Sequence, residues 1–299
     1  GYHVLGIYLD VSKAFDTVNH SILLSKLYNY GIRGSMHKWF NSYLSDRQQY
    51  VYINNVSSKT EIIHHGVPQG SCLGPLLFLL YINDLPNAVV NSETRLFADD
   101  ANQFMKNKNL IDLKADCEST VLQVLNWMNS NKLTINHEKT NFSIFSPKGI
   151  DNYADKFNYI HVAGKQIMRV NNVKYLGIFI NDDLSWKTHI ENLQNKLLQF
   201  CGIFYKYRYY LPPTVLKNLY FALIYPSIQY GIEIFANTKS SYLEDLKVLN
   251  NRVLRILQFG NLRTHLHDLY TRYNTLPAHL LHNYKLCLLV FQYLKSNAL

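Results

Sequence analysis

The segment TRLFADDANQFMK, residues 94–106, joins two apolar stretches through a pair of aspartates, Asp99 and Asp100. Apolar residues on both sides of a short polar break predict a β-hairpin with the aspartates at its turn. Two neighbouring carboxylates repel each other, so a bound cation would explain their position at the end of an apolar run. Aspartate is also common in ordinary turns, and the pair alone leaves both interpretations open.

A third aspartate, Asp10, ends the apolar stretch YHVLGIYLD at residues 2–10, which predicts a buried strand. If this strand pairs with the hairpin in an antiparallel sheet, Asp10 comes close to Asp99, and their repulsion requires a cation. Mg²⁺ suits such a site because it takes one or two carboxylates and leaves its other positions to water and phosphate. The similar segment IFINDDLSW, residues 178–186, is interpreted as a structural turn.

Turn residues and hydrophobic periodicity divide the chain into an α+β part and a helical part. Before residue 186 the pattern predicts an antiparallel sheet with helices on one face. It includes a hairpin over residues 48–54 and 59–66, a helix over residues 110–128 and strands over 132–136 and 141–145. The loop GVPQGSCLGP at residues 66–75 has three glycines and two prolines, so its backbone must be specifically shaped. After residue 186 the spacing is helical, with one helix predicted over residues 214–226. We therefore expect an α+β first part and an all-helical second part that begins at residue 186.

Composition indicates a folded protein, and its charge distribution suggests a polyanionic partner. The chain has 299 residues, 47% hydrophobic and 17% charged, with a net charge of +9. Residues 1–150 carry 13 basic and 12 acidic side chains, whereas residues 151–299 carry 17 and 9. A basic second half suggests that it holds a polyanion. Ordinary solubility charge is the alternative.

The spacing of the cysteines and the length of the apolar runs indicate in which cellular compartment the protein works. Four cysteines lie far apart in the sequence and are interpreted as reduced thiols of an intracellular protein. The longest apolar run, LLFLLYI at residues 76–82, is much shorter than the roughly 20 residues that a membrane helix needs, so we expect no membrane partner. The chain opens on Gly1 rather than Met, which suggests a fragment or excised domain.

Five segments carry polar or acidic residues in a fixed order along the chain: LDVSKAFDTVNH at 9–20, GVPQGSCLGPLLFLLYINDLP at 66–86, LFADD at 96–100, LNWMNSNKLTINHEKTNFSIF at 125–145 and VKYLGIFINDDLSWKTHI at 173–190. In this order they resemble the motifs of reverse transcriptases, and look most like those of non-LTR (LINE-type, jockey-like) retrotransposons. The resemblance implies a right-hand polymerase. Its palm, with partial fingers at about 31–65, would occupy residues 1–185, a basic helical thumb 186–260 and a helical extension 261–299.

The resemblance also assigns roles to single residues. Asp10 and Asp99 match the aspartates that bridge two Mg²⁺ ions, with Mn²⁺ as a substitute, while Asp100 matches a less direct ligand and Val11 lends a backbone carbonyl. Phe15 matches a gate against the ribose 2′-hydroxyl, and a rigid ring can exclude an extra oxygen by sterics. Without the motif, Phe15 would be interpreted as a core aromatic.

Further assignments concern the substrates. Gln69 and Gly70 match the loop beneath the incoming nucleotide, and Lys139 matches a general acid for the leaving pyrophosphate, although a surface lysine is the alternative. Tyr175, Leu176 and Gly177 match the primer grip. The implied partners are an RNA template, a DNA primer and dNTPs, and the family resemblance implies the nucleus.

The resemblance implies an RNA-directed DNA polymerase, with one open alternative. Only nine residues precede Asp10, where the family has finger strands, so the chain could instead be a co-opted fragment that binds nucleic acid without polymerising. An RNA-copying RNA polymerase is disfavoured by Phe15. A Zn²⁺ site at His265, His267, His279 and His282 is a further, weaker possibility.

Overall fold

The computed structural model describes residues 1–146, 157–261 and 263–297. It contains two compact units, Gly1–Asn171 and Asn172–Leu299. Each unit has its own hydrophobic core.

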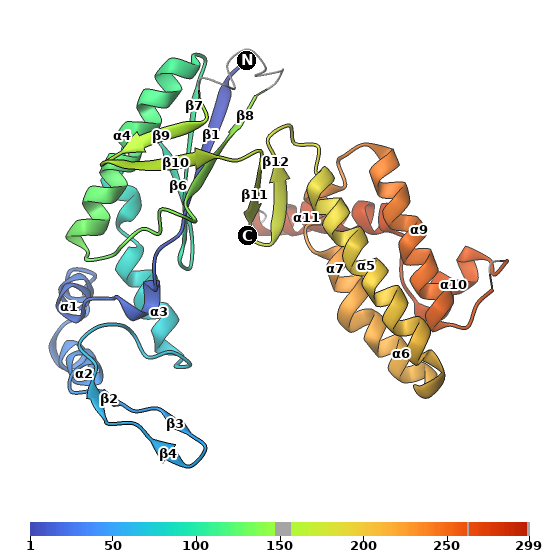
Figure 1. Cartoon of the computed structure of the whole chain (residues 1–299), viewed down its shortest axis with the longest axis horizontal. Coiled ribbons are helices and arrows are strands. Elements are labelled where there is room, and N and C mark those ends of the chain that lie inside the picture. Colours follow the sequence, from blue (N-terminus) through green and yellow to red (C-terminus); the bar gives the residue numbers. More distant parts are fainter. Residues whose placement is uncertain (147–156, 262, 298–299) are drawn as a thin grey trace. The chain divides into compact units, whose positions relative to one another are not determined.

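The first unit is built on a six-stranded sheet in the order β6-β7-β1-β8-β10-β9 (Figure 1). The strands are β1 (His3–Leu9), β6 (Glu93–Phe97), β7 (Asp100–Asn107), β8 (Asn141–Phe145), β9 (Tyr159–Val162) and β10 (Lys165–Arg169). β10 runs parallel to β8, whereas the other neighbouring pairs are antiparallel. The expectation of a purely antiparallel sheet was therefore wrong at one pair, because the β9–β10 hairpin joins the sheet through its second strand.

Helices complete the first unit. They are α1 (His20–Asn29), α2 (Gly34–Leu44), α3 (Leu73–Ile82) and α4 (Leu110–Ser130), with short 3-10 turns at Ala14–Asp16 and Leu85–Ala88. α4 packs against β1, β7 and β9 (Figure 1), and its buried Val121 and Val124 share a core with Leu5 and Ile7 of β1. The expected α+β class is confirmed.

Two predicted strand regions are shorter than expected. The hairpin near residues 48–66 forms only two-residue strands, β2 (Gln48–Gln49), β3 (Tyr52–Ile53), β4 (Val56–Ser57) and β5 (Glu61–Ile62). Residues 132–136 form no regular strand and contribute one isolated bridge, Val11 to Ile135. That bridge nevertheless ties the segment to the end of β1.

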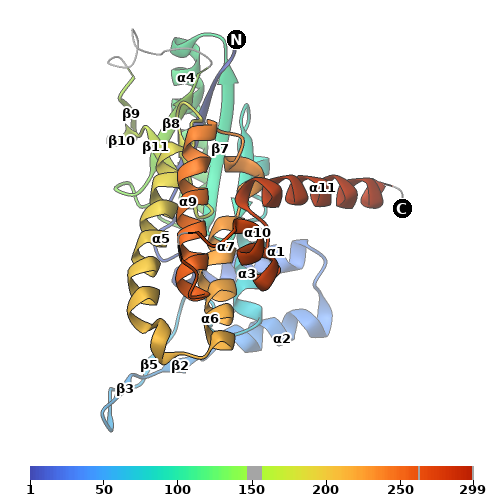
Figure 2. The ribbon, with the colours of Figure 1, turned by 90° about the vertical axis from the view of Figure 1, so that its right-hand side faces the viewer.

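The second unit begins with a hairpin and continues as helices. It contains β11 (Asn172–Tyr175), β12 (Ile178–Asn181), α5 (Lys187–Tyr207), α6 (Pro213–Leu219), α7 (Tyr225–Gln229), α8 (Ile232–Phe235), α9 (Ser240–Leu257), α10 (Leu266–Tyr273) and α11 (Ala278–Asn297). A 3-10 turn spans Arg208–Tyr210, and a π-helical turn spans Tyr220–Ile224. α5 and α9 lie side by side (Figures 1 and 2). None of the described helices combines the length and the hydrophobicity needed to cross a membrane.

Candidate active site

Asp10 lies just beyond the end of β1, the most buried strand of the first unit. Leu5, Ile7 and Leu9 of this strand are buried, and the backbone N–H of Asp10 donates to Thr140 Oγ1 at 3.3 Å. The carbonyl oxygen of Asp10 accepts from the Asn136 N–H at 2.8 Å. The segment 134–140 therefore fixes the backbone of Asp10 where regular sheet pairing stops.

Asp99 and Asp100 lie where β6 turns into β7, as the hairpin prediction required. Phe97 pairs with Asp100 across the turn, and Ala98 adopts a left-handed φ of 51°. This conformation favours glycine, so an alanine here is under backbone strain. The pairing of Leu9 with Ala101, extended by one residue, brings the end of β1 level with the start of β7.

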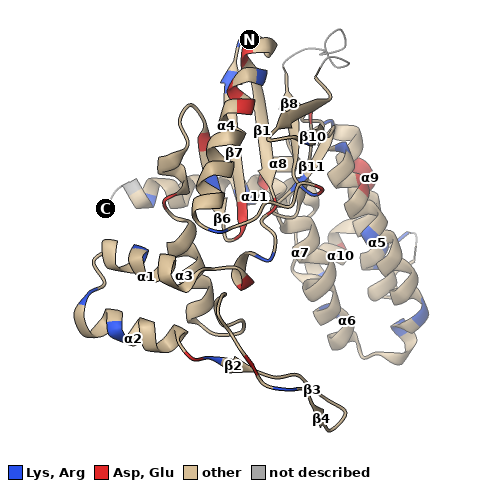
Figure 3. Cartoon of the chain, turned by 60° about the vertical axis from the view of Figure 1, so that its left-hand side comes forward, with Lys and Arg blue, Asp and Glu red and all other residues tan. Residues whose placement is uncertain are grey.

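The three carboxylates are close enough to repel one another. The pKa of Asp100 is raised, first by partial burial and then by the negative charges of Asp99 and Asp10. In the described part of the chain, no lysine, arginine or histidine lies within ion-pair distance of these aspartates. Figure 3 shows the acidic turn between β6 and β7. The aspartates therefore repel one another without an ion-paired partner among the described residues, although Lys13 and Lys139 line the same pocket.

One pocket of about 460 Å³ gathers most of the sequence-predicted residues of the first unit. Its lining includes Asp10, Val11, Phe15, Gln69, Asp99 and Lys139. Asp100 and Gly70 are neighbours of lining residues in the sequence but do not themselves line the pocket. Segments that are far apart in the chain thus meet around a single polar cavity.

Contacts between two loops hold the Phe15 ring in place. The Phe15 ring packs on Phe78 of α3, with 4.7 Å between ring centroids, and its carbonyl oxygen accepts from the Val67 N–H at 2.8 Å. Gly66 permits this close approach: it has a φ of 88°, and a Cβ there would lie 2.9 Å from the Asp16 carbonyl oxygen. The Phe15 ring is therefore supported from behind.

The sequence does not assign a site role to Ser12, Lys13, Ala14, Asp16 or Asn136, which also line the pocket. Two of them, Asp16 and Asn136, make hydrogen bonds that shape the site. Asp16 accepts a hydrogen bond from Gln69 Nε2 at 2.7 Å, and Asn136 lines the pocket while donating its backbone N–H to Asp10. Asp16 lies within LDVSKAFDTVNH, so its charge and its place in the first motif were a usable signal. Asn136 gave none, because its position depends on the nonlocal bridge between Val11 and Ile135.

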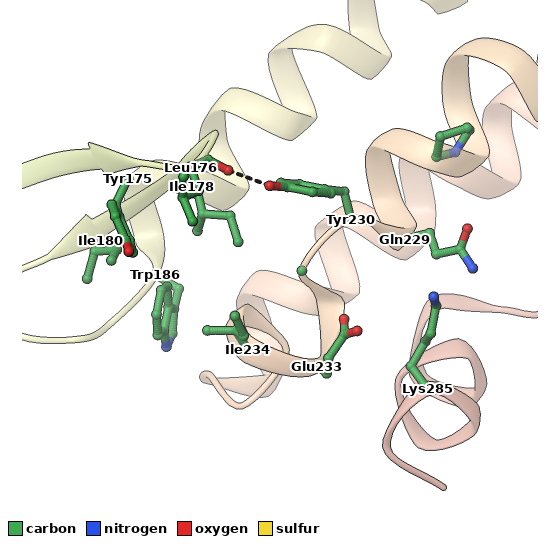
Figure 4. A pocket seen from close by; sticks show the side chains of 12 residues that line it. Tyr175, Leu176, Ile178, Ile180, Trp186, Gln229, Tyr230, Glu233, Ile234 and Lys285 are labelled. Carbon is green, nitrogen blue, oxygen red and sulfur yellow. Dashed lines mark hydrogen bonds between the residues drawn. The ribbon is translucent and has the colours of Figure 1, made fainter. Parts of the chain in front are cut away.

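The predicted primer-grip residues lie in the second unit, at the turn between β11 and β12. Leu176 and Gly177 have φ values of 46° and 83° and form a two-residue turn. The Tyr230 hydroxyl donates to the Leu176 carbonyl oxygen at 2.5 Å (Figure 4). Tyr175 and Leu176 also line a pocket of about 530 Å³ with Trp186 and Tyr230. The turn is thus fastened to the loop that follows α7.

The donor chemistry of the first-unit pocket fits a hard divalent cation. Asp10 and Asp99 offer carboxylate oxygens at the same edge of the sheet, and positive charge would relieve the repulsion that, after burial, raises the pKa of Asp100. Among the described residues, no group of three or more His, Cys, Asp or Glu side chains is arranged to hold a metal ion. A Mg²⁺ site with two carboxylates and substrate phosphates does not need such a group.

The pocket therefore defines a class of site: acidic residues, an aromatic ring and an amide at the ends of central strands, suited to a phosphate-bearing substrate. Residues 2–180 match the family described as "Reverse transcriptase (RNA-dependent DNA polymerase)", and the chain belongs to this family. The expected family is confirmed. Reverse transcriptases generally use divalent metals.

Relatives from mobile elements agree with this family. The RNA-directed DNA polymerase from mobile element jockey of Drosophila melanogaster is 26% identical, over 85% of this chain and 28% of the relative. A probable RNA-directed DNA polymerase from transposon X-element of the same organism is 25% identical, over 84% of this chain and 28% of the relative. The relatives are non-LTR retrotransposon polymerases, and the chain spans little more than a quarter of their length.

A solved structure of telomerase from Candida tropicalis in complex with a TWJ fragment of telomeric RNA is a structural neighbour. It has a TM-score of 0.44 and 13% sequence identity, and the match covers 91% of this chain and 49% of that one.

Proposed function

We propose that this chain is the polymerase core of a retrotransposon RNA-directed DNA polymerase. It would extend a DNA primer on an RNA template by transferring nucleotides from dNTPs to the primer 3′-hydroxyl. The observation that carries the proposal is the single pocket that joins Asp10 and Asp99 with Phe15 and Gln69. The family match over residues 2–180 and the printed names of the relatives support it.

Two Mg²⁺ ions would be held by the carboxylates of Asp10 and Asp99 and by the backbone carbonyl of Val11, with Asp100 as a nearby acid. When bound, such ions supply charge neutralisation for the triphosphate and lower the pKa of the attacking hydroxyl. The protein's contribution is to fix these oxygens rigidly. The hydrogen bonds from Asn136 and to Thr140 at the backbone of Asp10 serve that purpose.

Other residues of the pocket act on the nucleotide. The Phe15 ring, supported by Phe78, would exclude a ribose 2′-hydroxyl by occupying its space. Gln69, oriented by its hydrogen bond to Asp16, would contact the nucleotide from the side of the loop. Lys139 lines the same pocket and could pass a proton to the leaving pyrophosphate.

The second unit would hold the template and primer. From residue 186 onward it carries 13 basic and 5 acidic side chains, and phosphate contacts of this kind are independent of sequence and weaken with salt. The turn at Leu176 and Gly177 would orient the primer end. Location in the nucleus remains part of this proposal.

Primer extension tests the function. Extension of a labelled DNA primer on an RNA template should proceed with Mg²⁺ or Mn²⁺, and Asp99→Ala should slow it more than about 100-fold, because it removes several kcal/mol of transition-state stabilisation. Asp112→Ala, an exposed aspartate on α4, is the matched control. Equal activity in the two variants would refute the assignment. Retained template binding without extension by the wild type would instead support a nucleic-acid-binding fragment.

A further inference from the structure

The segment YKYRYY, residues 205–210, carries exposed aromatic rings interleaved with basic side chains at the C-terminal end of α5. Tyr205, Tyr209 and Tyr210 are 61%, 71% and 81% exposed. Large rings left this open to water normally mark a contact surface. Figure 3 shows basic residues gathered at this end of α5.

A cavity of about 890 Å³ opens beside this segment, between α5 and α9 of the second unit. The two helices run in the same direction, so their C-terminal ends are neighbours (Figures 1 and 2). The cavity is lined by Tyr205 and Arg208 from α5 and its end, and by Arg252 and Arg255 from α9. Three arginines thus converge on one concave surface.

These arginines have no acidic partner in the part of the chain that the structure describes. The Nε atoms of Arg208 and Arg255 are buried and make no hydrogen bond to the described residues. Arg208 instead lies over the rings of Tyr205 and Tyr209, each at 4.7 Å from the ring centroid, and its Nη2 donates to the Tyr209 hydroxyl at 2.8 Å. Guanidinium groups that lack an acidic partner and keep buried donors without hydrogen bonds are suited to bind an anion.

Compensation of helix dipoles explains only part of this charge. Each helix C-terminus carries about half a negative charge, so two adjacent ends balance roughly one arginine. Arg208, Arg252 and Arg255 together with Lys206 exceed that amount. Dipole compensation also gives no reason for exposed rings at the same place.

Phe259 supplies a second, independent observation. It follows the end of α9 with a left-handed φ of 55°, and the next N–H, that of Gly260, donates to the Arg255 carbonyl oxygen at 2.8 Å. This is the helix-ending motif in which glycine usually holds the left-handed position. A phenylalanine there is strained, yet its ring is 48% exposed and lies 5.4 Å from the Tyr209 ring centroid. Strain of this kind persists at functional sites.

We propose that this aromatic–arginine cluster, made of Tyr205, Arg208, Tyr209, Arg252, Arg255 and Phe259, binds an unpaired strand of nucleic acid. Phosphodiester groups would contact the arginines, and bases would stack on the rings. The rings favour an unpaired strand because the base faces of a duplex are already covered by neighbouring pairs. RNA and DNA share this chemistry. The site deepens the proposed holding of template and primer by the second unit and rests on that part of the proposed function, but it does not depend on the catalytic assignment of Asp10 and Asp99.

Fluorescence anisotropy with the full chain tests the proposal. The probes are a labelled 12-nucleotide RNA, a DNA of the same sequence and the corresponding duplex, without dNTPs or divalent ions. Phe259→Gly should raise the Kd for the single strands at least about fivefold, because one stacking contact is lost. The Tm of the Phe259→Gly variant should not fall, because glycine relieves the strain of the left-handed backbone. Arg252→Gln, an exposed position, should weaken the same binding and lower the slope of log Kd against log salt by about one.

Matched controls lie on α11: Phe291→Ala and Lys295→Gln remove the same ring and the same charge elsewhere and should leave single-strand binding within twofold. If both test variants bind single-stranded RNA and DNA more weakly, the site recognises phosphates and bases that the two nucleic acids share. If only RNA binding is weakened, the site is supported and its ligand is RNA. Unchanged single-strand binding in both test variants, an equal loss of duplex binding, or full competition by polyglutamate would overturn the proposal. Asp99→Ala should leave this binding intact, so failure of the polymerase assignment is read separately.

Discussion

At the scale of single residues, the candidate site contains groups that lower the free energy of unfolding. Asp100 carries a raised pKa because burial and the charges of Asp99 and Asp10 disfavour its ionised form. Ala98 adds left-handed strain at the same turn. Both features oppose folding of the free chain, as is common where a site must hold like charges for a ligand.

Asp100→Asn should raise the Tm in buffer containing a chelator. The folded-state pKa of Asp100 lies above its ordinary value of 3.8, so the protonated form is favoured on folding, and stability is lost as pH rises through the folded pKa. The gain from the amide should therefore appear at pH 7 and vanish below pH 3.8. Thermal unfolding by circular dichroism measures it. Asp112→Asn should show no such gain, and an equal gain there would contradict the repulsion argument.

The sequence motifs were sufficient to name most of the site residues. They did not predict how the side chains of these residues are arranged around the pocket. Asp10, Asp99, Phe15 and Gln69 could be listed from the sequence, and the pocket brings them together. Which of the paired aspartates lines the pocket depends on the alternation of side chains across the turn. Asn136 could not be found, since a bridge between distant segments puts it there.

At the scale of elements, the β11–β12 turn is held by one phenol. Tyr230 donates to the Leu176 carbonyl oxygen, and its ring lies against Gly177, where a Cβ would come within 3.4 Å. On the other side, a Cβ at Gly231 would lie 2.3 Å from Ile178 Cδ1. Two glycines thus allow the hairpin to dock closely on the loop after α7.

Tyr230→Phe should raise the KM for primer–template about 2- to 12-fold and leave kcat nearly unchanged, because one hydrogen bond worth roughly 0.5–1.5 kcal/mol no longer positions the turn. Steady-state extension at varied primer–template concentration measures it. Tyr293→Phe, on an exposed part of α11, serves as the control. A fall in kcat without a change in KM would argue against a role in holding the primer.

Local pattern predicted the long helices well and sheet pairing less well. The predicted helix at 110–128 corresponds to α4, Leu110–Ser130, because its apolar spacing is regular over five turns. The predicted helix at 214–226 is broken by the π-helical turn before Pro226, which cannot donate a backbone hydrogen bond. The parallel pairing of β10 with β8 depends on which strand of a hairpin meets the sheet, and no local pattern records that choice.

At the scale of the whole molecule, the chain divides at Asn171, before the hairpin, whereas hydrophobic periodicity predicted the change from mixed to helical structure near residue 186. Hydrophobic alternation identifies a hairpin but does not say which body it joins. Here Ile178 and Leu176 join it to the helices through Gly231 and Tyr230. The functional division into palm, thumb and extension remains a prediction.

The second unit should lose stability in mild acid. Burial lowers the pKa of His189 below its ordinary value of 6.5, and the ring packs edge-on against Phe235 at 4.8 Å. Because the folded pKa is depressed, the unfolded state takes up the proton first, so stability is complete above pH 6.5 and is lost as pH falls below it, by at most about 1.4 kcal/mol per pH unit.

Amide hydrogen exchange at pH 7.5 and 5.5 measures the loss of stability separately in each of the two units. Protection of α5 and α8 should fall at the lower pH, and His189→Leu should reduce the fall, whereas His64→Gln, an exposed histidine of the first unit, should not. His137 also has a lowered pKa, from burial and the charge of Lys165, but it belongs to the first unit. An unchanged pH dependence in His189→Leu would exclude the buried ring as its source.

The phenylalanine at the end of α9 has a consequence for laboratory evolution. A library randomised at position 259 and screened only for survival of heating should enrich glycine and asparagine, which tolerate the left-handed backbone. A library screened for capture of single strands should keep phenylalanine, tyrosine or tryptophan. The two screens would diverge at one codon, and that divergence would show selection for ligand binding against fold stability.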